Sequence, residues 1–133
     1  MIVLDASAVL ELLLNTPAGQ AVAERISATG HGLHAPHLVD VEIAQALRRY
    51  AREGKLALTE AAEAIDDLHD LDLNRHAHEP LLDRIWQLRE NFSAYDAAYI
   101  ALAEALDAVL LTCDARLTRA PRAAHRVELV ARS

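Results

Sequence analysis

Two carboxylates follow apolar segments of the chain in the same local pattern, which makes them candidates for shared chemistry. Asp5 ends the run IVLD, and Asp114 closes the run AVLLTCD. Each acid has a hydroxyl two residues away: Ser7 follows Asp5 and Thr112 precedes Asp114. Aspartate is also a favoured helix N-cap, so either acid alone is explained equally well as a cap. If both runs are strands of one parallel sheet, the two acids meet at the edge where ligands bind.

Two further acids could reach the same place from helices. Glu42 lies among apolar residues, with Leu38 and Ala46 one helical turn away on either side, so its carboxylate is on or beside a buried stripe. A buried carboxylate needs a partner, which could be an arginine in a structural ion pair or a metal ion. Asp96 stands three residues after Ser93, a spacing that also suits a variant of the helix capping box.

The four acids are more informative together than singly. Carboxylates at close quarters repel one another and raise each other's pKa values, so such a cluster is unfavourable unless a cation occupies it. Carboxylate oxygens suit Mg²⁺ or Mn²⁺. A divalent ion can activate water, orient a phosphate and stabilise charge on a phosphodiester under attack. The residues therefore predict a site for a divalent cation, provided that the fold brings them to one side of the molecule.

The spacing of apolar residues predicts alternating strands and helices that would position these acids. Thr16 with Pro17 indicates the start of a helix, Gly54 the end of another, and Pro80 fits only a first helical turn. The expected strands cover 2–5, 33–36, 71–73, 108–112 and 127–130. The expected helices cover 7–14, 16–29, 38–53, 59–69, 77–90, 94–106 and 115–120. This alternation is typical of a parallel sheet covered on both faces, so we expect one α/β domain over residues 1–133.

The charge of the chain leaves the substrate class open. The 133 residues are 53% hydrophobic and 25% charged, with a net charge of −7 at pH 7, which disfavours a polyanionic ligand. Of the 13 basic residues, all but Lys55 are arginine, the better bidentate phosphate ligand. The arginines cluster at 48–52 and 116–126, although such clusters also occur as solvated helix faces. The net charge therefore neither proves nor excludes nucleic acid.

The start of the chain and its cysteine content favour the cytoplasm. The segment MIVLDASAVLELLL has no basic leader and carries Asp5 and Glu11 within its apolar stretch, which argues against a secretory signal. The single cysteine, Cys113, cannot form an internal disulfide, as expected in a reducing compartment. The apolar runs are too short to cross a bilayer. We expect a cytoplasmic protein that does not associate with a membrane.

Four stretches of the sequence resemble the PIN-domain nucleases, and among them the VapC-type toxins of toxin–antitoxin pairs. They are MIVLDASAVL, APHLVDVEIAQALRR, SAYDAAYIALAEAL and LLTCDARL, in that family's order and approximate spacing. The resemblance implies a three-layer α/β/α fold around a parallel sheet of four to five strands in the order 3-2-1-4-5. It further implies an endoribonuclease that depends on Mg²⁺ or Mn²⁺, inhibits translation or growth, binds a VapB-type antitoxin and forms a homodimer.

The resemblance also implies roles for individual residues. Asp5 and Asp96 would bind the metal ion, and Asp114 would hold it directly or through water. Glu42 would be the fourth catalytic acid, and either it or Asp114 would position and deprotonate the attacking water. Two hydroxyls match the supporting residues of the family, those of Ser7 and Thr112. The expected products carry a 5′ phosphate and a 3′ hydroxyl.

Other protein classes fit the acids less well or stay open. A phosphatase of the haloacid-dehalogenase type needs a second aspartate at the position of Ser7, and a response-regulator receiver needs a lysine after a late strand, where this chain has none. A housekeeping RNA-processing nuclease and a non-catalytic binding module on the same fold both remain open. Mn²⁺-dependent cleavage of RNA would exclude the binding module, and an antitoxin reading frame beside the gene would favour the toxin.

The remaining polar and aromatic candidates favour structural explanations. We expect five histidines to be solvated loop residues: His31, His34, His37, His76 and His78. We expect a cysteine and four aromatic residues to lie in the core or an interface: Cys113, Trp86, Phe92, Tyr95 and Tyr99. Leftover apolar positions could form a groove for a partner helix: Leu10, Leu13, Leu14 and Leu47.

Overall fold

Five parallel strands form a single sheet in the computed structural model, which describes residues 1–30, 32–118 and 126–132. The strands are β1 (Ile2–Leu4), β2 (Leu33–Pro36), β3 (Leu73–His76), β4 (Val109–Thr112) and β5 (Val127–Leu129). Their order in the sheet is β3-β2-β1-β4-β5, with every neighbouring pair parallel. The predicted fold class and strand order are therefore confirmed.

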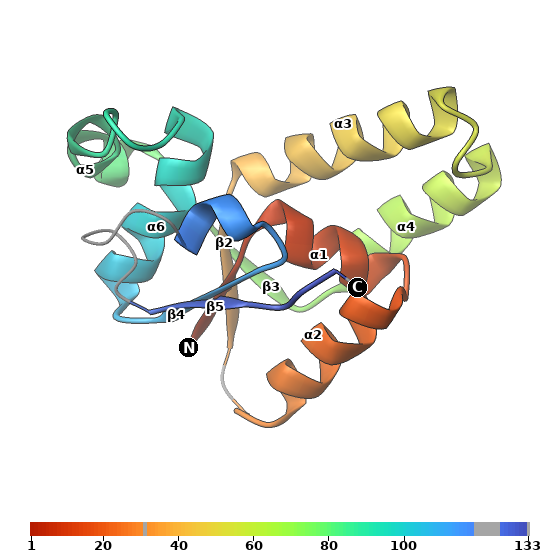
Figure 1. Ribbon diagram of the computed structural model, residues 1–133, viewed down its shortest axis with the longest axis horizontal. Helices are drawn as coiled ribbons and strands as arrows, with labels where there is room; N and C mark the ends of the chain where they lie inside the picture. The colour runs from red at the N-terminus through yellow and green to blue at the C-terminus, as the bar shows by residue number, and fades with distance from the viewer. Residues whose placement is uncertain (31, 119–125, 133) are drawn as a thin grey trace.

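Helices cover both faces of this sheet (Figure 1). The α-helices are α1 (Ala6–Leu13), α2 (Pro17–Ser27), α3 (Leu38–Arg52), α4 (Leu58–Asp70), α5 (Leu82–Gln87) and α6 (Ala94–Leu106). Two 3₁₀ turns, η1 (Glu79–Leu81) and η2 (Ala115–Thr118), complete the described elements. Helices α5 and α6 lie on one side of the sheet and α1 to α4 on the other, with α3 and α4 projecting as a hairpin. This is the expected three-layer arrangement.

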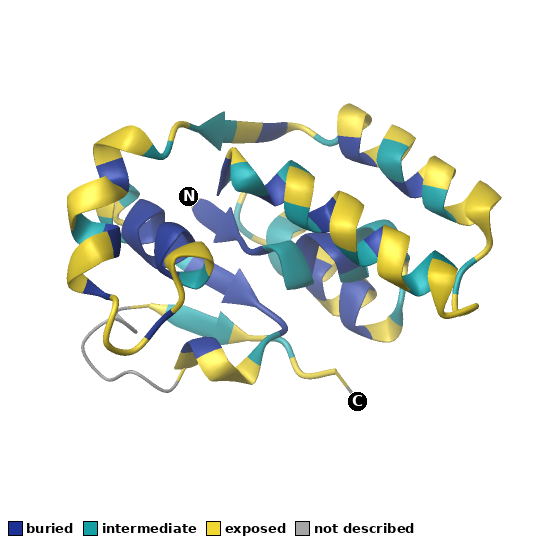
Figure 2. Ribbon diagram, turned by 90° about the horizontal axis from the view of Figure 1, so that it is seen from above, coloured by how far each residue is buried: buried dark blue, intermediate teal, exposed yellow. Residues whose placement is uncertain are grey.

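The central strand is β1, and its register with β4 determines which residues lie side by side where the two strands end. Ile2, Val3 and Leu4 are each at most 1% exposed, because β2 and β4 flank the strand and helices cover it (Figure 2). In register, Leu4 lies beside Leu111 of β4. The residues that follow on the two strands, Asp5 and Thr112, therefore emerge side by side at the carboxyl edge of the sheet.

Side-chain caps begin three of the helices, and they do so where the sequence indicates. The Thr16 hydroxyl accepts a hydrogen bond from the Gly19 amide at 3.0 Å, with Pro17 at the first helical position of α2. The Ser93 hydroxyl accepts from the Asp96 amide at 3.1 Å, which fixes the start of α6. Asp5 caps α1, so it ends the strand without belonging to it.

Several predicted boundaries differ from the structure, and three of these differences have an identifiable local reason. The strand expected at 71–73 is instead Leu73–His76, because the Leu71 amide still bonds to the last turn of α4. The helix expected over 77–90 is reduced to η1 and the short α5, in keeping with Pro80 in the first of these turns. Helix α4 begins before Thr59, because the Glu60 carboxylate accepts from the Ala57 amide at 3.0 Å. The end of the helix expected at 115–120 lies outside the described residues.

Helix length and hydropathy bear on the membrane expectation. Within residues 1–30, 32–118 and 126–132, no helix combines the length and the apolar character that crossing a bilayer requires.

Candidate active site

Asp5 stands at the centre of the carboxyl edge of the sheet and is 6% exposed. One carboxylate oxygen accepts hydrogen bonds from the Ser7 hydroxyl at 2.7 Å and the Ala8 amide at 3.0 Å. The other oxygen accepts from the Thr112 hydroxyl at 2.6 Å. Burial raises the pKa of Asp5, although these three hydrogen bonds oppose the shift. Asp5 is thus a helix cap and a buried functional candidate at once, so the two explanations do not exclude each other.

The hydroxyls of Ser7 and Thr112 connect the ends of β1 and β4. Besides donating to Asp5, the Ser7 oxygen accepts from the Cys113 amide at 2.9 Å. The Thr112 oxygen accepts from the Asp114 amide, also at 2.9 Å. Each hydroxyl therefore uses its proton on Asp5 and a lone pair on the backbone of the β4 end. The two residues fix the direction of Asp5 relative to Asp114, which suits the supporting role expected for them.

Glu42 reaches the same edge from α3, and its partner there is Tyr99 of α6. The Tyr99 hydroxyl donates a hydrogen bond to a Glu42 carboxylate oxygen at 2.6 Å. The alternative of an arginine partner for Glu42 is therefore not what the structure shows. Burial raises the pKa of Glu42 and the nearby charges of Asp96 and Asp5 add to this, while the hydrogen bond from Tyr99 lowers it. Burial and the neighbouring carboxylates also raise the pKa of Tyr99.

Tyr99 is the residue that sequence reasoning missed. It was expected to pack in the core or at a dimer contact, and its ring is indeed 2% exposed, yet its hydroxyl belongs to the acidic site. A signal was present in the sequence. Tyr99 follows Asp96 by three positions in a helix, and residues at that spacing share a face.

Asp96 lies in the first turn of α6 and is half-buried. Burial raises its pKa, the charge of Arg116 lowers it, and the charge of Asp114 raises it again. Asp114, just after β4, pairs with Arg116 two residues further along the chain. Both of its oxygens accept from that guanidinium, with Nε 3.0 and 3.1 Å away and Nη2 2.6 Å away, and this pairing lowers the pKa of Asp114.

All four predicted acids line one open cleft of about 280 Å³. Its wall also includes Ser7, Tyr99 and three arginines, Arg49, Arg116 and Arg132. Thr112 lies beneath the cleft, fully buried, and acts on it through Asp5. The fold therefore meets the condition set at the outset, because acids separated by up to 109 positions face one space.

The side chains of the cleft fit a divalent cation by their chemistry. The carboxylates offer hard oxygen ligands of the kind that Mg²⁺ and Mn²⁺ bind. Burial and mutual repulsion raise the pKa values of Asp5, Glu42 and Asp96, and a cation would relieve the cause. In the part of the chain that the structure describes, however, no three His, Cys, Asp or Glu side chains are already gathered closely enough to hold a metal ion.

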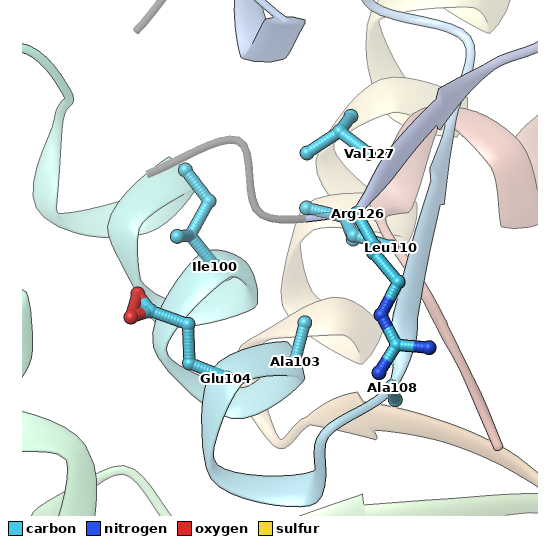
Figure 3. Close-up of a pocket in the computed structure, with 7 residues that line it drawn as sticks. All are labelled: Ile100, Ala103, Glu104, Ala108, Leu110, Arg126 and Val127. Atoms are coloured by element: carbon cyan, nitrogen blue, oxygen red, sulfur yellow. The ribbon is translucent and has the colours of Figure 1, made fainter. Parts of the chain in front are cut away.

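A second hollow, on the α5 and α6 side, contains none of these acids. Figure 3 shows it between α6, β4 and β5, with Glu104 and Arg126 at its rim and apolar side chains behind them. Its volume is about 10 Å³, too little for more than a water molecule. This hollow therefore offers no room for a substrate.

Two of the five histidines, His34 and His76, are strand residues and not the solvated loop residues that we expected, whereas His37 is exposed in a turn, as expected, and His78 is a half-buried loop residue. His34 and His76 lie in neighbouring strands, and their ring nitrogens are 2.9 Å apart. The His78 ring accepts a hydrogen bond from the Leu38 amide at 3.0 Å and meets His37 edge to face. The expectation failed for His76 because β3 lies later in the chain than predicted and includes it, and for His34 because its ring meets that of His76 across the two strands. His31 lies outside the described residues.

Other expectations divide between confirmed and wrong. Cys113 is a buried core residue, and burial raises the pKa of its thiol to about 11, which is unsuitable for a nucleophile. Phe92 is also in the core. Trp86 and Tyr95 are 67% and 65% exposed, so they are not core residues, and an interface role for them stays a prediction. Of the leucines expected to form an apolar groove, Leu10 and Leu47 are buried in the core and so are closed to a partner, whereas Leu13 and Leu14 are only partly buried against it.

The chain matches the family model described as the PIN domain over residues 2–123. It therefore belongs to the PIN-domain family.

Within that family the chain is similar to the VapC ribonucleases. It is 45% identical to Ribonuclease VapC9 of Mycobacterium tuberculosis over 99% of this chain and 100% of that protein. Two solved structures share its fold. PAE2754 from Pyrobaculum aerophilum has a TM-score of 0.71 and 24% identity, over 95% of this chain and 81% of that one. VapBC2 from Rickettsia felis, bound to a promoter DNA fragment, has a TM-score of 0.69 and 15% identity, over 97% and 98%.

Proposed function

We propose that this chain is a metal-dependent endoribonuclease and the toxin of a toxin–antitoxin pair. The single observation that carries the proposal is the convergence of Asp5, Glu42, Asp96 and Asp114 on one cleft. The relatives that the chain matches over their whole length are named ribonucleases, which supports RNA as the substrate and hydrolysis as the reaction.

Three aspartates would hold Mg²⁺ or Mn²⁺: Asp5, Asp96 and Asp114. Asp5 is oriented for this by its three hydrogen bonds, and Asp96 projects from the first turn of α6, near the positive end of the helix dipole. When bound, the ion would stabilise the charge of the phosphate and favour loss of a proton from water. The divalent ion would thus supply the positive charge that the buried carboxylates need as a partner.

Glu42 would accept the proton from the attacking water. Its raised pKa makes the carboxylate a stronger base than an exposed glutamate, and the Tyr99 hydroxyl keeps one oxygen oriented. Asp114 shares this task only to the extent that Arg116 releases it, because both its oxygens accept from that guanidinium. Attack in line on phosphorus would then expel the 3′ oxygen and leave a 5′ phosphate.

The proposal extends to partners. We expect single-stranded RNA as substrate, a VapB-type antitoxin as protein partner, and a homodimer as the state in solution. The structural relative VapBC2 from Rickettsia felis is named for such a toxin–antitoxin complex, which supports an antitoxin for this chain as well.

Cleavage of RNA by matched variants tests the proposal. We expect the purified protein to cleave single-stranded RNA with Mg²⁺ or Mn²⁺, to stop with EDTA, and to leave 5′ phosphates. Asp96→Asn should lower the rate by at least about 100-fold, because the cation that would stabilise the charge of the transition state loses a ligand. The control is Asp83→Asn, an exposed acid on α5 outside the cleft. Full activity of Asp96→Asn would refute the assignment.

Growth separates a toxin from a housekeeping nuclease. Expression of the wild-type chain should arrest growth, expression of Asp96→Asn should not, and the small reading frame next to the gene should restore growth when co-expressed. Arrest without rescue by a neighbouring gene product would argue for a nuclease outside a toxin–antitoxin pair.

A further inference from the structure

Arg116 is a cation of the chain itself that contacts the acidic cleft. Its Nε lies 3.0 and 3.1 Å from the two oxygens of Asp114, and its Nη2 lies 2.6 Å from one of them. It also interacts electrostatically with Asp96 and Asp5. The guanidinium therefore faces three of the four acids, and both oxygens of Asp114 are engaged by it.

The two side chains of this ion pair differ in exposure to solvent. The side chain of Asp114 is 22% exposed, whereas that of Arg116 is 69% exposed. The Arg116 amide also donates to Asp114 at 3.0 Å, so the carboxylate stays in place when the guanidinium leaves. An exposed ion pair contributes at most about 1 kcal/mol, so a competing ligand can displace the arginine at little cost.

A released guanidinium would lie at the mouth of the cleft. Arginine binds carboxylate and phosphate by the same two-pronged geometry, so a phosphate there can replace Asp114 as its partner. Arg49 and Arg132 line the same cleft. Arg132 pairs with Glu11 at 3.4 Å. Among the interactions that the described residues make, none joins Arg49 to Asp5, Glu42, Asp96 or Asp114. Arg116 is thus the arginine bonded directly to a proposed metal ligand.

We propose that Arg116 exchanges partners: it pairs with Asp114 in the free protein, yields that carboxylate to the divalent cation, and then binds a phosphate of the RNA. The inference rests on the proposed function of the cleft and names a substrate-binding residue that the family motifs in the sequence did not single out. It makes cation binding and RNA binding cooperative, because a cation that takes Asp114 frees the arginine for the phosphate.

Cation binding without RNA tests the first half of the exchange. Mn²⁺ is titrated into the full chain, and free Mn²⁺ is followed by its electron paramagnetic resonance signal. Arg116→Gln should bind Mn²⁺ at least about threefold more tightly than the wild type, since an exposed ion pair no longer competes for Asp114. Arg49→Gln is the matched control, because it removes the same charge from the same cleft without removing a bond to Asp114.

The outcomes are distinct. If Arg116→Gln binds Mn²⁺ no more tightly than the wild type, the inference is overturned and the proposed function stands. The same holds if Arg49→Gln gains as much Mn²⁺ affinity as Arg116→Gln, because the net charge of the cleft alone would then explain the gain. Failure of the wild type to bind Mn²⁺ overturns the proposed function and the exchange with it. Thermal melting of each variant checks that the fold is intact, and Arg116→Lys, which keeps the charge without the two-pronged geometry, should fall between wild type and Arg116→Gln.

RNA binding tests the second half. In a Glu42→Gln background, which removes the proposed base, affinity for a short single-stranded RNA is measured by fluorescence anisotropy over a range of salt. With Mn²⁺, Arg116→Gln should weaken binding and reduce the salt dependence by about one phosphate contact, a slope of about 0.7. With EDTA the loss should be smaller, because Asp114 then holds the guanidinium. An equal loss in both conditions, or none, contradicts the exchange.

Discussion

The hydroxyl of Tyr99 illustrates how one buried group adjusts a neighbouring acid. It donates to Glu42 at 2.6 Å across two helices, and this bond lowers a pKa that burial raises. A donor to the ionised form favours ionisation, so its removal moves the pKa of Glu42 further up. The same residue fills the core with its ring, so its two roles can be separated by removing only the hydroxyl.

Tyr99→Phe should therefore change both pH dependence and stability. Glu42 must be ionised to accept a proton, so activity is lost when the pH falls below the pKa of Glu42. Because the variant raises that pKa further, it should lose activity at a higher pH than the wild type. Loss of the bond should also cost about 1–2 kcal/mol of unfolding free energy. Rate against pH and urea unfolding measure the two effects. Tyr95→Phe, exposed on the same helix, is the control, and an identical pH profile for Tyr99→Phe would contradict the proposed role of Glu42.

Asp5 and Asp96 should respond differently to the loss of charge. In the structure, Asp5 accepts three hydrogen bonds, and the Thr112 hydroxyl that donates to it is already used as an acceptor by the Asp114 amide. If the NH₂ group of an asparagine faced the Thr112 hydroxyl, two donors would point at each other. Asp5→Asn should therefore lower the melting temperature.

Asp96→Asn should leave the melting temperature unchanged or raise it near neutral pH. The raised pKa of Asp96 means that its charged form is less favourable in the folded state than in the unfolded chain. Stability linked to this group is present below the unfolded pKa and lost as pH rises through the folded value. A neutral side chain removes that loss. Melting curves of both variants at pH 4 and pH 7 check the contrast, and a large destabilisation by Asp96→Asn at pH 7 would contradict it.

At the scale of elements, the contact between α1 and α2 depends on a glycine. A Cβ on Gly19 would lie 1.9 Å from the backbone oxygen of Glu11, and backbone atoms cannot rotate away as a side chain does. Gly19 sits in the first turn of α2, where the Thr16 cap already fixes the chain. The close packing of these helices supports α1, which follows directly on Asp5.

Gly19→Ala separates two opposing effects by their sign. Helix propensity alone predicts a gain of about 1 kcal/mol for alanine over glycine inside a helix. The steric clash predicts instead a loss of about 1–3 kcal/mol. We expect the loss, measured by denaturant unfolding. The neighbouring exposed position gives the control, since Gln20→Ala should change stability by less than about 0.5 kcal/mol. A stabilised Gly19→Ala would show that the helices can separate.

At the scale of the whole molecule, the acidic cleft connects elements from both faces of the sheet. Glu42 comes from α3 on one face, Asp96 from α6 on the other, and Asp5 and Asp114 from strand ends between them. A cation in the cleft would bind the assembled fold and not the unfolded chain, so it would stabilise the molecule as a unit.

Mn²⁺ should therefore raise the melting temperature of the wild type. Saturation at 100 times the dissociation constant corresponds to about 2.7 kcal/mol. Asp96→Asn should lose most of this shift while starting from an equal or higher melting temperature without Mn²⁺. Differential scanning fluorimetry across a Mn²⁺ titration measures it, with Ca²⁺ and Na⁺ as controls for ionic strength. A shift of the same size in Asp96→Asn would place the cation elsewhere.

The sequence alone determined the parts of this protein that depend on short-range pattern. Apolar runs of three or four residues, helical periodicity and caps such as Thr16 and Ser93 act within a few positions, so they identify most elements and the four acids on them. Their similarity to a family then supplied the strand order. Boundaries near Leu71 and Ala77 failed because neighbouring elements, not local pattern, decide where those segments end.

Only the tertiary structure decided which side chains became partners. The bonds of Tyr99 to Glu42, of Thr112 to Asp5 and of His34 to His76 join residues 57, 107 and 42 positions apart. Such pairs exist because the sheet places β1 beside β4 and packs α6 against β1 and β2. Hydrogen bonds need atoms placed within a few tenths of an ångström, and the spacing of residue types along a chain does not contain that information.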